Sequence, residues 1–293
     1  MSDSELSPLF VSIRTMQSGD LEAAMELKNA EGWNQTLLDW KLFMENSPES
    51  CLVATYRDKV IGTVTGINYE DKVAWIGMML VNHAYRGQGI SKRLMTAVIQ
   101  SLSTASSIKL DATPAGFPVY EKLGFRQEYA LIRMTCDSFT PSTAYTKNLV
   151  NVSPLTTENL FEIFPIDNEA FGADRRNVLK HAQRQQSGIS CMYKENGKVK
   201  GFLLARSGTR YLHLGPLVAI DSEVAKTLLT YAGSRIGNKS LVVDTPVFSS
   251  GWVSWLESCG FQKQRDLYRM YLKCNSRPGN PDRCFLAAGP ELG

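Results

Sequence analysis

Residues 73–95 read VAWIGMMLVNHAYRGQGISKRLM and contain three local signals in a row. Residues 73–81 are apolar and β-prone, which predicts a strand. From Leu94 on, apolar residues recur every three to four positions, which is typical of one face of an amphipathic helix. The turn between them, RGQGIS at residues 86–91, therefore lies at the end of a strand and at the N-terminus of a helix.

A glycine-rich turn in this position suits an anion. The first N–H groups of a helix have no acceptor inside the helix, and the helix dipole puts partial positive charge there. Gly87 and Gly89 have no side chains, so a pyrophosphate can approach the backbone, and Arg86 and Lys92 add positive charge. The turn is neither a dinucleotide fingerprint nor a Walker A loop. Taken alone, it equally fits a tight connection whose glycines serve only the backbone geometry.

The same stretch resembles the acyl-CoA signature of the GCN5-related N-acetyltransferases (GNAT), Arg/Gln-x-x-Gly-x-Gly/Ala after a strand. Arg86, Gly89 and Ser91 occupy its three defined positions, with Ser91 a mild departure. Residues 119–125, VYEKLGF, resemble the downstream Tyr-x-x-x-Gly-Phe motif of that family. The resemblance implies a mixed α/β (α+β) fold with a central mixed sheet flanked by helices, acetyl-CoA as cosubstrate and no metal.

The resemblance also implies which residues bind acetyl-CoA. In the family, two strands splay apart at the signature, and the pantetheine arm pairs with the first of them. Carried over to this chain, the pantetheine meets the backbone of Met79, Leu80 and Val81. The pyrophosphate is then held by the residues of the turn, namely Arg86, Gly87, Gln88, Gly89, Ile90, Ser91 and Lys92.

Two side chains are candidates for proton transfer. Tyr120 stands where the family usually has its general acid, a phenol that can protonate the departing thiolate; a core tyrosine is the alternative. Asp111 ends the strand predicted at residues 108–112, where it can bind an ammonium group or accept its proton. A cap for the following turn or helix is its alternative. Thr113 replaces an asparagine that contacts the cofactor in many family members.

The acceptor pocket is expected where residues 32–34, Gly-Trp-Asn, interrupt two predicted helices. Trp33 is expected to wall the pocket, and Asn34 and Asp111 to bind the acceptor; a buried anchor is the alternative for Trp33. The expected activity is transfer of an acetyl group to the primary amine of a small molecule by direct attack, with Tyr120 as general acid. A non-catalytic acyl-CoA sensor or scaffold, and an acetyltransferase of protein N-termini or lysines, are the alternatives.

The second half of the chain repeats the first. Residue types at Gly62, Gly77, Asp111 and Gly124 recur 133–139 residues later, at Gly201, Gly215, Asp244 and Gly260. This predicts a catalytic domain at residues 1–140, a linker at 141–151 and a second GNAT-like domain at 152–293. The second copy has acids, Asp221 and Glu223, in place of the glycine turn, and Leu256 in place of Tyr120. It is expected to bind no CoA.

Composition excludes several classes of function. A net charge of +3 over 293 residues gives no reason to expect a nucleic acid or membrane partner. No apolar run approaches the length of a membrane span and no signal peptide is evident, so a cytoplasmic location is expected. The six cysteines and three histidines lack metal-ligand spacing. An oligomer is allowed but not indicated by the sequence.

The last nine residues, FLAAGPELG at 285–293, are apolar for a chain end and are expected to pack against the protein. A docked strand is the favoured interpretation. The alternative is that Glu291 reaches the acceptor site.

Overall fold

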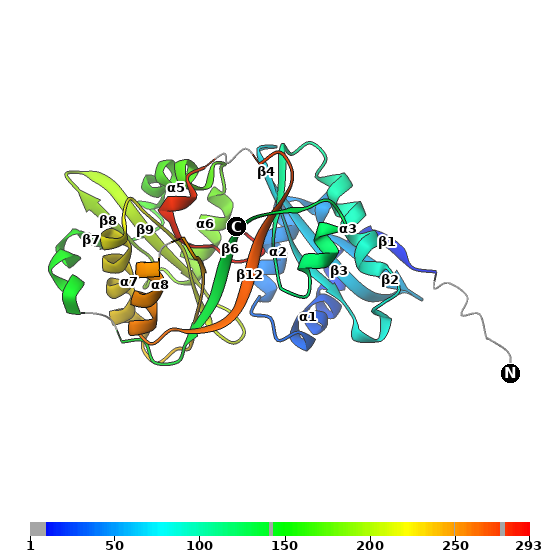
Figure 1. Ribbon diagram of the computed structural model, residues 1–293, viewed down its shortest axis with the longest axis horizontal. Coiled ribbons are helices and arrows are strands. Elements are labelled where there is room, and N and C mark those ends of the chain that lie inside the picture. The colour runs from blue at the N-terminus through cyan, green and yellow to red at the C-terminus, as the bar shows by residue number, and fades with distance from the viewer. Residues whose placement is uncertain (1–9, 141–142, 249, 276–278) are drawn as a thin grey trace.

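The computed structural model describes residues 10–140, 143–248, 250–275 and 279–293, and it has the mixed α/β fold expected from the sequence (Figure 1). We call residues 10–140 the front half and residues 143–293 the rear half. The front half contains β1 (Ser12–Thr15), α1 (Leu21–Ala30), α2 (Leu37–Asn46), β2 (Leu52–Tyr56), β3 (Lys59–Tyr69), β4 (Val73–Val81), α3 (Ile90–Ser101), β5 (Ser107–Ala112), α4 (Phe117–Glu121) and β6 (Arg126–Cys136).

The rear half repeats this order, as the repeat in the sequence predicts. Its elements are β7 (Val152–Pro154), α5 (Phe164–Phe171), α6 (Arg176–Gln185), β8 (Cys191–Glu195), β9 (Lys198–Arg206), β10 (Leu212–Ala219), α7 (Ser222–Ile236), β11 (Leu241–Pro246), α8 (Ser250–Ser258), β12 (Gln262–Lys273) and the short β13 (Cys284–Leu286). Within the described residues, no helix has both the length and the apolar character needed to cross a bilayer.

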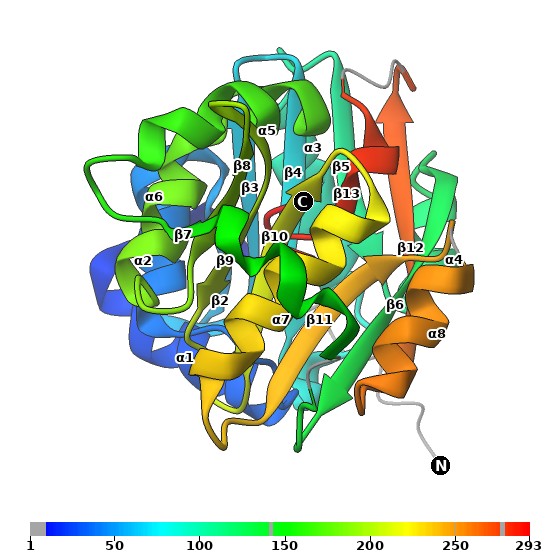
Figure 2. The same ribbon diagram turned by 90° about the vertical axis from the view of Figure 1, so that its left-hand side faces the viewer.

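Helices cover both faces of the sheet. In Figure 2, α1, α2, α5 and α6 lie on one side of the strands, and α4 and α8 lie on the other. The buried side chains agree with this arrangement, because α1 and α2 share one apolar cluster with Val178 of α6, whereas α3 packs in a separate cluster on the front half. Apolar side chains therefore pack on both faces of the sheet, and the cluster under α1 and α2 contains residues of both halves.

The two halves do not form separate sheets. The strand order is β1-β2-β3-β4-β5-β12-β6-β11-β10-β9-β8-β7, so β12 of the rear half lies between β5 and β6 of the front half. Correspondingly, β6 pairs with β11, and both exchanged strands lie at the middle of the molecule (Figure 1). The expected division at residues 141–151 remains a prediction about sequence units, but each half needs the other's last long strand to complete its sheet.

Two equivalent buried ion pairs hold each exchanged strand, β12 and β6, to its neighbour from the other half. On one side, Arg269 of β12 donates from Nε and Nη2 to Asp111 of β5 at 2.8 and 2.9 Å. On the other side, Arg133 of β6 donates from Nε and Nη2 to Asp244 of β11 at 2.7 and 2.8 Å. The two partners of each pair lie directly opposite each other in the antiparallel ladder. Bidentate geometry of this kind fixes register as well as adding charge-assisted hydrogen bonds.

The predicted linker is ordered over most of its length. Thr143–Asn151 forms a 3-10 helix, and Leu149 packs against the apolar cluster that contains α7. Residues 141 and 142 of the predicted linker lie outside the described residues.

Candidate active site

A fork opens between β4 and β5 of the front half. These parallel strands pair only from Val73–Ser107 to Trp75–Lys109. Just beyond, β4 bulges: Met78 has a φ of 50°, the register with β3 shifts, and Thr63 Oγ1 donates to the Met78 carbonyl oxygen at 2.9 Å. A bulge bends its strand, which explains why the ladder with β5 ends here. The segment predicted to meet pantetheine, residues 79–81, follows this bulge.

The glycine turn follows β4 and is open to solvent. Gly87 and Gly89 have φ values of 79° and 74°, a backbone conformation that favours glycine, and Gly89 is the N-cap of the 12-residue helix α3. A Cβ built on either glycine would meet no atom within 4 Å. The turn therefore has the bare, outward-facing backbone that a pyrophosphate needs.

The remaining turn residues differ in exposure. Arg86, Gln88 and Lys92 are exposed, Ser91 is half-buried, and Ile90 is buried in the core, so Ile90 offers the turn only its backbone. The Arg86 guanidinium forms an ion pair with Glu31 and donates from Nε to the Val81 carbonyl oxygen at 3.0 Å. The sequence suggested a free positive charge at Arg86, and the structure adds a carboxylate that partly neutralises it.

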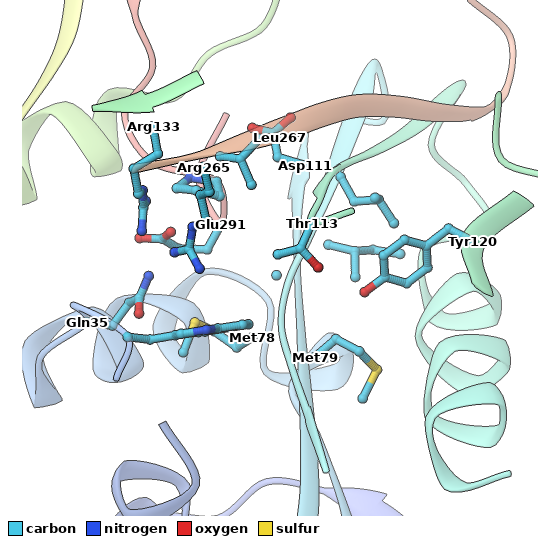
Figure 3. A pocket seen from close by; sticks show the side chains of 15 residues that line it. Gln35, Met78, Met79, Asp111, Thr113, Tyr120, Arg133, Arg265, Leu267 and Glu291 are labelled. Atoms are coloured by element: carbon cyan, nitrogen blue, oxygen red, sulfur yellow. The ribbon is translucent and has the colours of Figure 1, made fainter. Parts of the chain in front are cut away.

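A cavity occupies the fork and extends toward the rear half. Figure 3 shows its two ends, with Tyr120, Thr113 and Met79 at one end and Gln35, Arg133, Arg265 and Glu291 gathered at the other. We call the second group the polar end. The lining residues are Trp33, Gln35, Ile76, Gly77, Met78, Met79, Leu110, Asp111, Thr113, Tyr120, Arg133, Arg265, Leu267, Pro290 and Glu291.

Tyr120 lies on α4 and lines this cavity, as its predicted role requires. Its ring packs edge-on against Phe125, with centroids 6.1 Å apart. Burial raises the pKa of Tyr120 to about 12, so the phenol stays protonated at neutral pH. Thr113 Oγ1 accepts from the Gly116 amide at 3.2 Å and so stabilises the turn that leads into α4. The helix is short, and this turn sets the direction of Tyr120.

Asp111 also lines the cavity, but its carboxylate is already engaged. Both oxygens accept from Arg269, whose guanidinium also donates to the Tyr129 hydroxyl at 2.6 Å and lies over the Trp75 ring at 4.4 Å. Burial raises the pKa of Asp111, although Arg269 opposes this shift. The geometry therefore indicates that Asp111 is an ion-pair partner that holds β12 in place. It does not favour Asp111 as a free group that binds the amine.

In the segment of residues 33–35, the side chains that line the cavity are not all the expected ones. Trp33 lines the cavity. Asn34 does not, because its side chain donates to the Tyr211 carbonyl oxygen at 3.0 Å and accepts from the Arg210 and Tyr211 amides at 3.0 and 2.9 Å. Asn34 thus ties the front half to the rear half, and its neighbour Gln35 reaches the cavity instead.

The C-terminal segment carries Glu291 into the cavity. Trp75 Nε1 donates to the Pro290 carbonyl oxygen at 2.9 Å, and the Tyr69 hydroxyl donates to the Leu292 carbonyl oxygen at 3.0 Å. These bonds hold Glu291 against Gly77, and one of its oxygens forms an ion pair with Arg206. Burial raises the pKa of Glu291, against the effect of Arg206. The structure supports both interpretations of this chain end, because residues 284–286 dock as strand β13 against β10 and Glu291 lines the cavity. That this cavity receives the acceptor stays a prediction.

The same segment closes the equivalent fork in the rear half. The parallel strands β10 and β11 pair only at Leu212–Leu241 and His213–Val242, and β13 then lies against β10. Phe285 and Ala287 bond to Thr245 and Asp244 of β11, so this short strand occupies the opening between the two strands. The rear half therefore fills, with its own chain, the space that stays a cavity in the front half.

Two other features distinguish the rear half, which the sequence predicts to bind no CoA, from the front half. Asp221 accepts from the Val224 amide at 2.9 Å and so caps α7 with a carboxylate, where the front half has open glycines. Leu256, in place of Tyr120, is fully buried in the core.

Among the described residues, no group of three or more His, Cys, Asp or Glu side chains is arranged to hold a metal ion.

Some of the residues that sequence reasoning missed could have been found from the repeat, and others could not. Arg133 and Arg269 are 136 residues apart, the same spacing as Gly124 and Gly260, so the repeat could have marked them as an equivalent pair. Arg265 and Gln35 carry no local signal of this kind.

Comparisons with known proteins agree with this geometry. Two family models, each described as an acetyltransferase (GNAT) domain, match residues 22–135 and 163–286. A Bacillus subtilis protein described as uncharacterized N-acetyltransferase YitH is 31% identical over 192 residues, which is 64% of this chain and 66% of that protein. The holothin acyltransferase of Pseudoalteromonas sp. (strain SANK 73390) is 26% identical over 90% of this chain and 88% of its own length.

A solved structure shares the whole fold. The crystal structure of a putative acetyltransferase from Pyrococcus horikoshii has a TM-score of 0.81, with 23% identity over 100% of this chain and 99% of that one. The chain thus belongs to the GCN5-related N-acetyltransferase superfamily, as a tandem form with two such domains. It is an acyltransferase of the N-acetyltransferase type.

Proposed function

We propose that the front half transfers an acetyl group from acetyl-CoA to the primary amine of a small molecule. One observation carries the proposal: the fork between β4 and β5 remains a cavity with Tyr120 on its wall, whereas β13 fills the matching fork in the rear half. Members of this superfamily use acetyl-CoA as cosubstrate. A relative named for acyl transfer to holothin supports a small-molecule acceptor.

The residues present suit acetyl-CoA at this fork. The pyrophosphate would meet the amides of the turn at Gly87–Gly89 and the N-terminus of α3, with Lys92 adding positive charge. The pantetheine would lie along residues 79–81, where β4 has left β5. This arrangement directs the thioester toward the bulge at Met78 and the cavity.

In the proposed reaction, the amine nitrogen forms a bond to the thioester carbonyl carbon and the C–S bond breaks. The amine must lose a proton, and we assign that proton to Glu291, which has one oxygen without a hydrogen-bond partner among the described residues. Tyr120 gives its phenolic proton to the departing thiolate. Asp111 acts through Arg269, as a positioning residue, in place of the proton acceptor suggested by the sequence.

A thiol-release assay with acetyl-CoA and a panel of amines tests the proposal. Thiol release that depends on both acetyl-CoA and an amine, and that falls at least about tenfold in Tyr120→Phe with little change in cofactor affinity, is the expected result. The alternative of a sensor or scaffold predicts binding of acetyl-CoA by calorimetry without thiol release. An acceptor that is a protein N-terminus or lysine predicts transfer to peptides and none to free amines.

A further inference from the structure

Three polar atoms at the polar end of the cavity have no partner. Gln35 Oε1, Glu291 Oε2 and Arg265 Nε are buried and form no hydrogen bond with any of the described residues. Gln35 and Glu291 are only 4% and 3% exposed, and all three side chains line the cavity. Buried polar atoms in folded proteins are nearly always paired, so a group of three in one cavity indicates a ligand that supplies the missing partners.

Some of the charged side chains at the polar end have ion-pair partners and one does not. Arg133 is paired with Asp244, and Glu291 is paired through its other oxygen with Arg206. Within the described part of the chain, Arg265 forms no ion pair. Burial lowers the pKa of the Arg265 guanidinium, and the neighbouring Arg133 lowers it further, while Asp244, the carboxylate already bound by Arg133, opposes this shift.

The excess of positive charge continues into a neighbouring cavity. Arg133 and Arg265 also line this second cavity, together with Arg210 and Glu31. Glu31 is already engaged by Arg86 and His83. Arg210 is exposed and donates to the Gly32 carbonyl oxygen at 3.3 Å, so it adds a further positive charge to this second cavity.

We propose that the acceptor is an amine that also carries a carboxylate, as an amino acid does. Its ammonium N–H groups bond to Glu291 Oε2 and Gln35 Oε1, and its carboxylate bonds to Arg265. Guanidinium and carboxylate groups match as bidentate partners, and one unpaired guanidinium matches the single charge of a carboxylate better than the larger charge of a phosphate. This inference rests on the proposed function, since it takes the cavity to be the place of acetyl transfer.

Matched acceptors test the inference directly. Each α-amino acid in a panel is compared with the amine that remains when its carboxylate is removed, for example phenylalanine with phenethylamine, in the full-length protein with acetyl-CoA. The expected kcat/KM for the best amino acid exceeds that of its matched amine by about 30-fold or more. A matched amine that reacts as well as its amino acid would overturn the inference.

Variants on β12 identify the residue responsible. Arg265→Met removes the positive charge and keeps a long side chain, and it should bring the ratio between amino acid and matched amine to about one. Lys263→Met is the control, because Lys263 lies on the same strand, is exposed and pairs with Asp266. It removes the same charge and should leave the ratio at the wild-type value. A ratio unchanged in Arg265→Met, or lowered equally in both variants, contradicts the assignment.

Binding separates failure of this inference from failure of the proposed function. If no amine releases thiol from acetyl-CoA, the proposed function has failed, and calorimetry still decides the ligand class. N-acetylphenylalanine should then bind to the protein with CoA at least about 30-fold more tightly than N-acetylphenethylamine, and Arg265→Met should abolish the difference. Equal affinities, or no binding of either compound, would overturn the inference.

Discussion

Replacing Gly77 by alanine tests whether the segment that carries Glu291 is part of the active site. Gly77 lies on β4 next to the bulge at Met78. A Cβ built on it would meet Glu291 Cβ at 2.6 Å and Glu291 Cα at 2.8 Å. Ordinary contact begins near 3.4 Å, so the C-terminal segment must withdraw by roughly 0.8 Å. Because one of the two atoms belongs to the backbone, rotation of the Glu291 side chain cannot relieve the contact.

The expected cost follows from this displacement. Overpacking of a well-packed site costs about 1–3 kcal/mol of stability, and a misplacement of about 1 Å in a catalytic group costs about 100-fold in rate. We therefore expect Gly77→Ala to lower the melting temperature by a few degrees and to lower kcat by about 10- to 100-fold. The affinity for acetyl-CoA should stay within about threefold of wild type, because the turn at Gly87–Gly89 is unchanged.

Thiol release at saturating substrates, thermal unfolding and calorimetry with acetyl-CoA measure these three quantities. Gly188→Ala is the matched control, because a Cβ at Gly188 meets no atom within 4 Å and its backbone does not need glycine. This variant should behave as wild type in every assay. A Gly77→Ala protein that is destabilised but keeps the wild-type kcat would refute the catalytic placement of Glu291 and leave the segment a purely structural role.

Four further predictions concern single groups. Tyr120→Phe should lower kcat at least about tenfold with little change in acetyl-CoA affinity, and a wild-type kcat would remove Tyr120 as the acid. Gly89→Ala strains a backbone with a φ of 74° and should lower both stability, by about 1 kcal/mol, and acetyl-CoA affinity; Gly197→Ala, at a φ of 72° in the rear half, should lower stability alone. Asp221→Ala removes the cap of α7 and should cost about 1 kcal/mol of unfolding free energy by denaturant titration with acetyl-CoA affinity unchanged. Burial raises the pKa of Glu291, and a protonated carboxyl cannot accept a proton. As the pH falls, kcat/KM should therefore begin to drop at a pH higher than the ordinary pKa range of glutamate, and Glu291→Gln should lose this acidic limb of the pH profile.

Much of the front half could be predicted because its signals are local. The glycine turn, the helix that follows it and the position of Tyr120 each depend on residues within a few positions of one another, and the structure has all three. The repeat likewise predicted the order of elements in the rear half. Asn34 shows the limit of this reasoning, since its neighbours in sequence gave no sign that Arg210 and Tyr211 would occupy its side chain.

The sequence by itself determined the family, the doubled plan and the absence of the glycine turn in the second copy. Only the tertiary structure decided that β6 and β12 change places, that β13 fills the rear fork, and that Glu291 and Arg265 reach the front cavity. The physical reason is that an alternating apolar pattern specifies a strand but not the edge with which it pairs. That choice depends on ladders, ion pairs and packing between residues more than 100 positions apart, such as Asp111 with Arg269, which no local pattern contains.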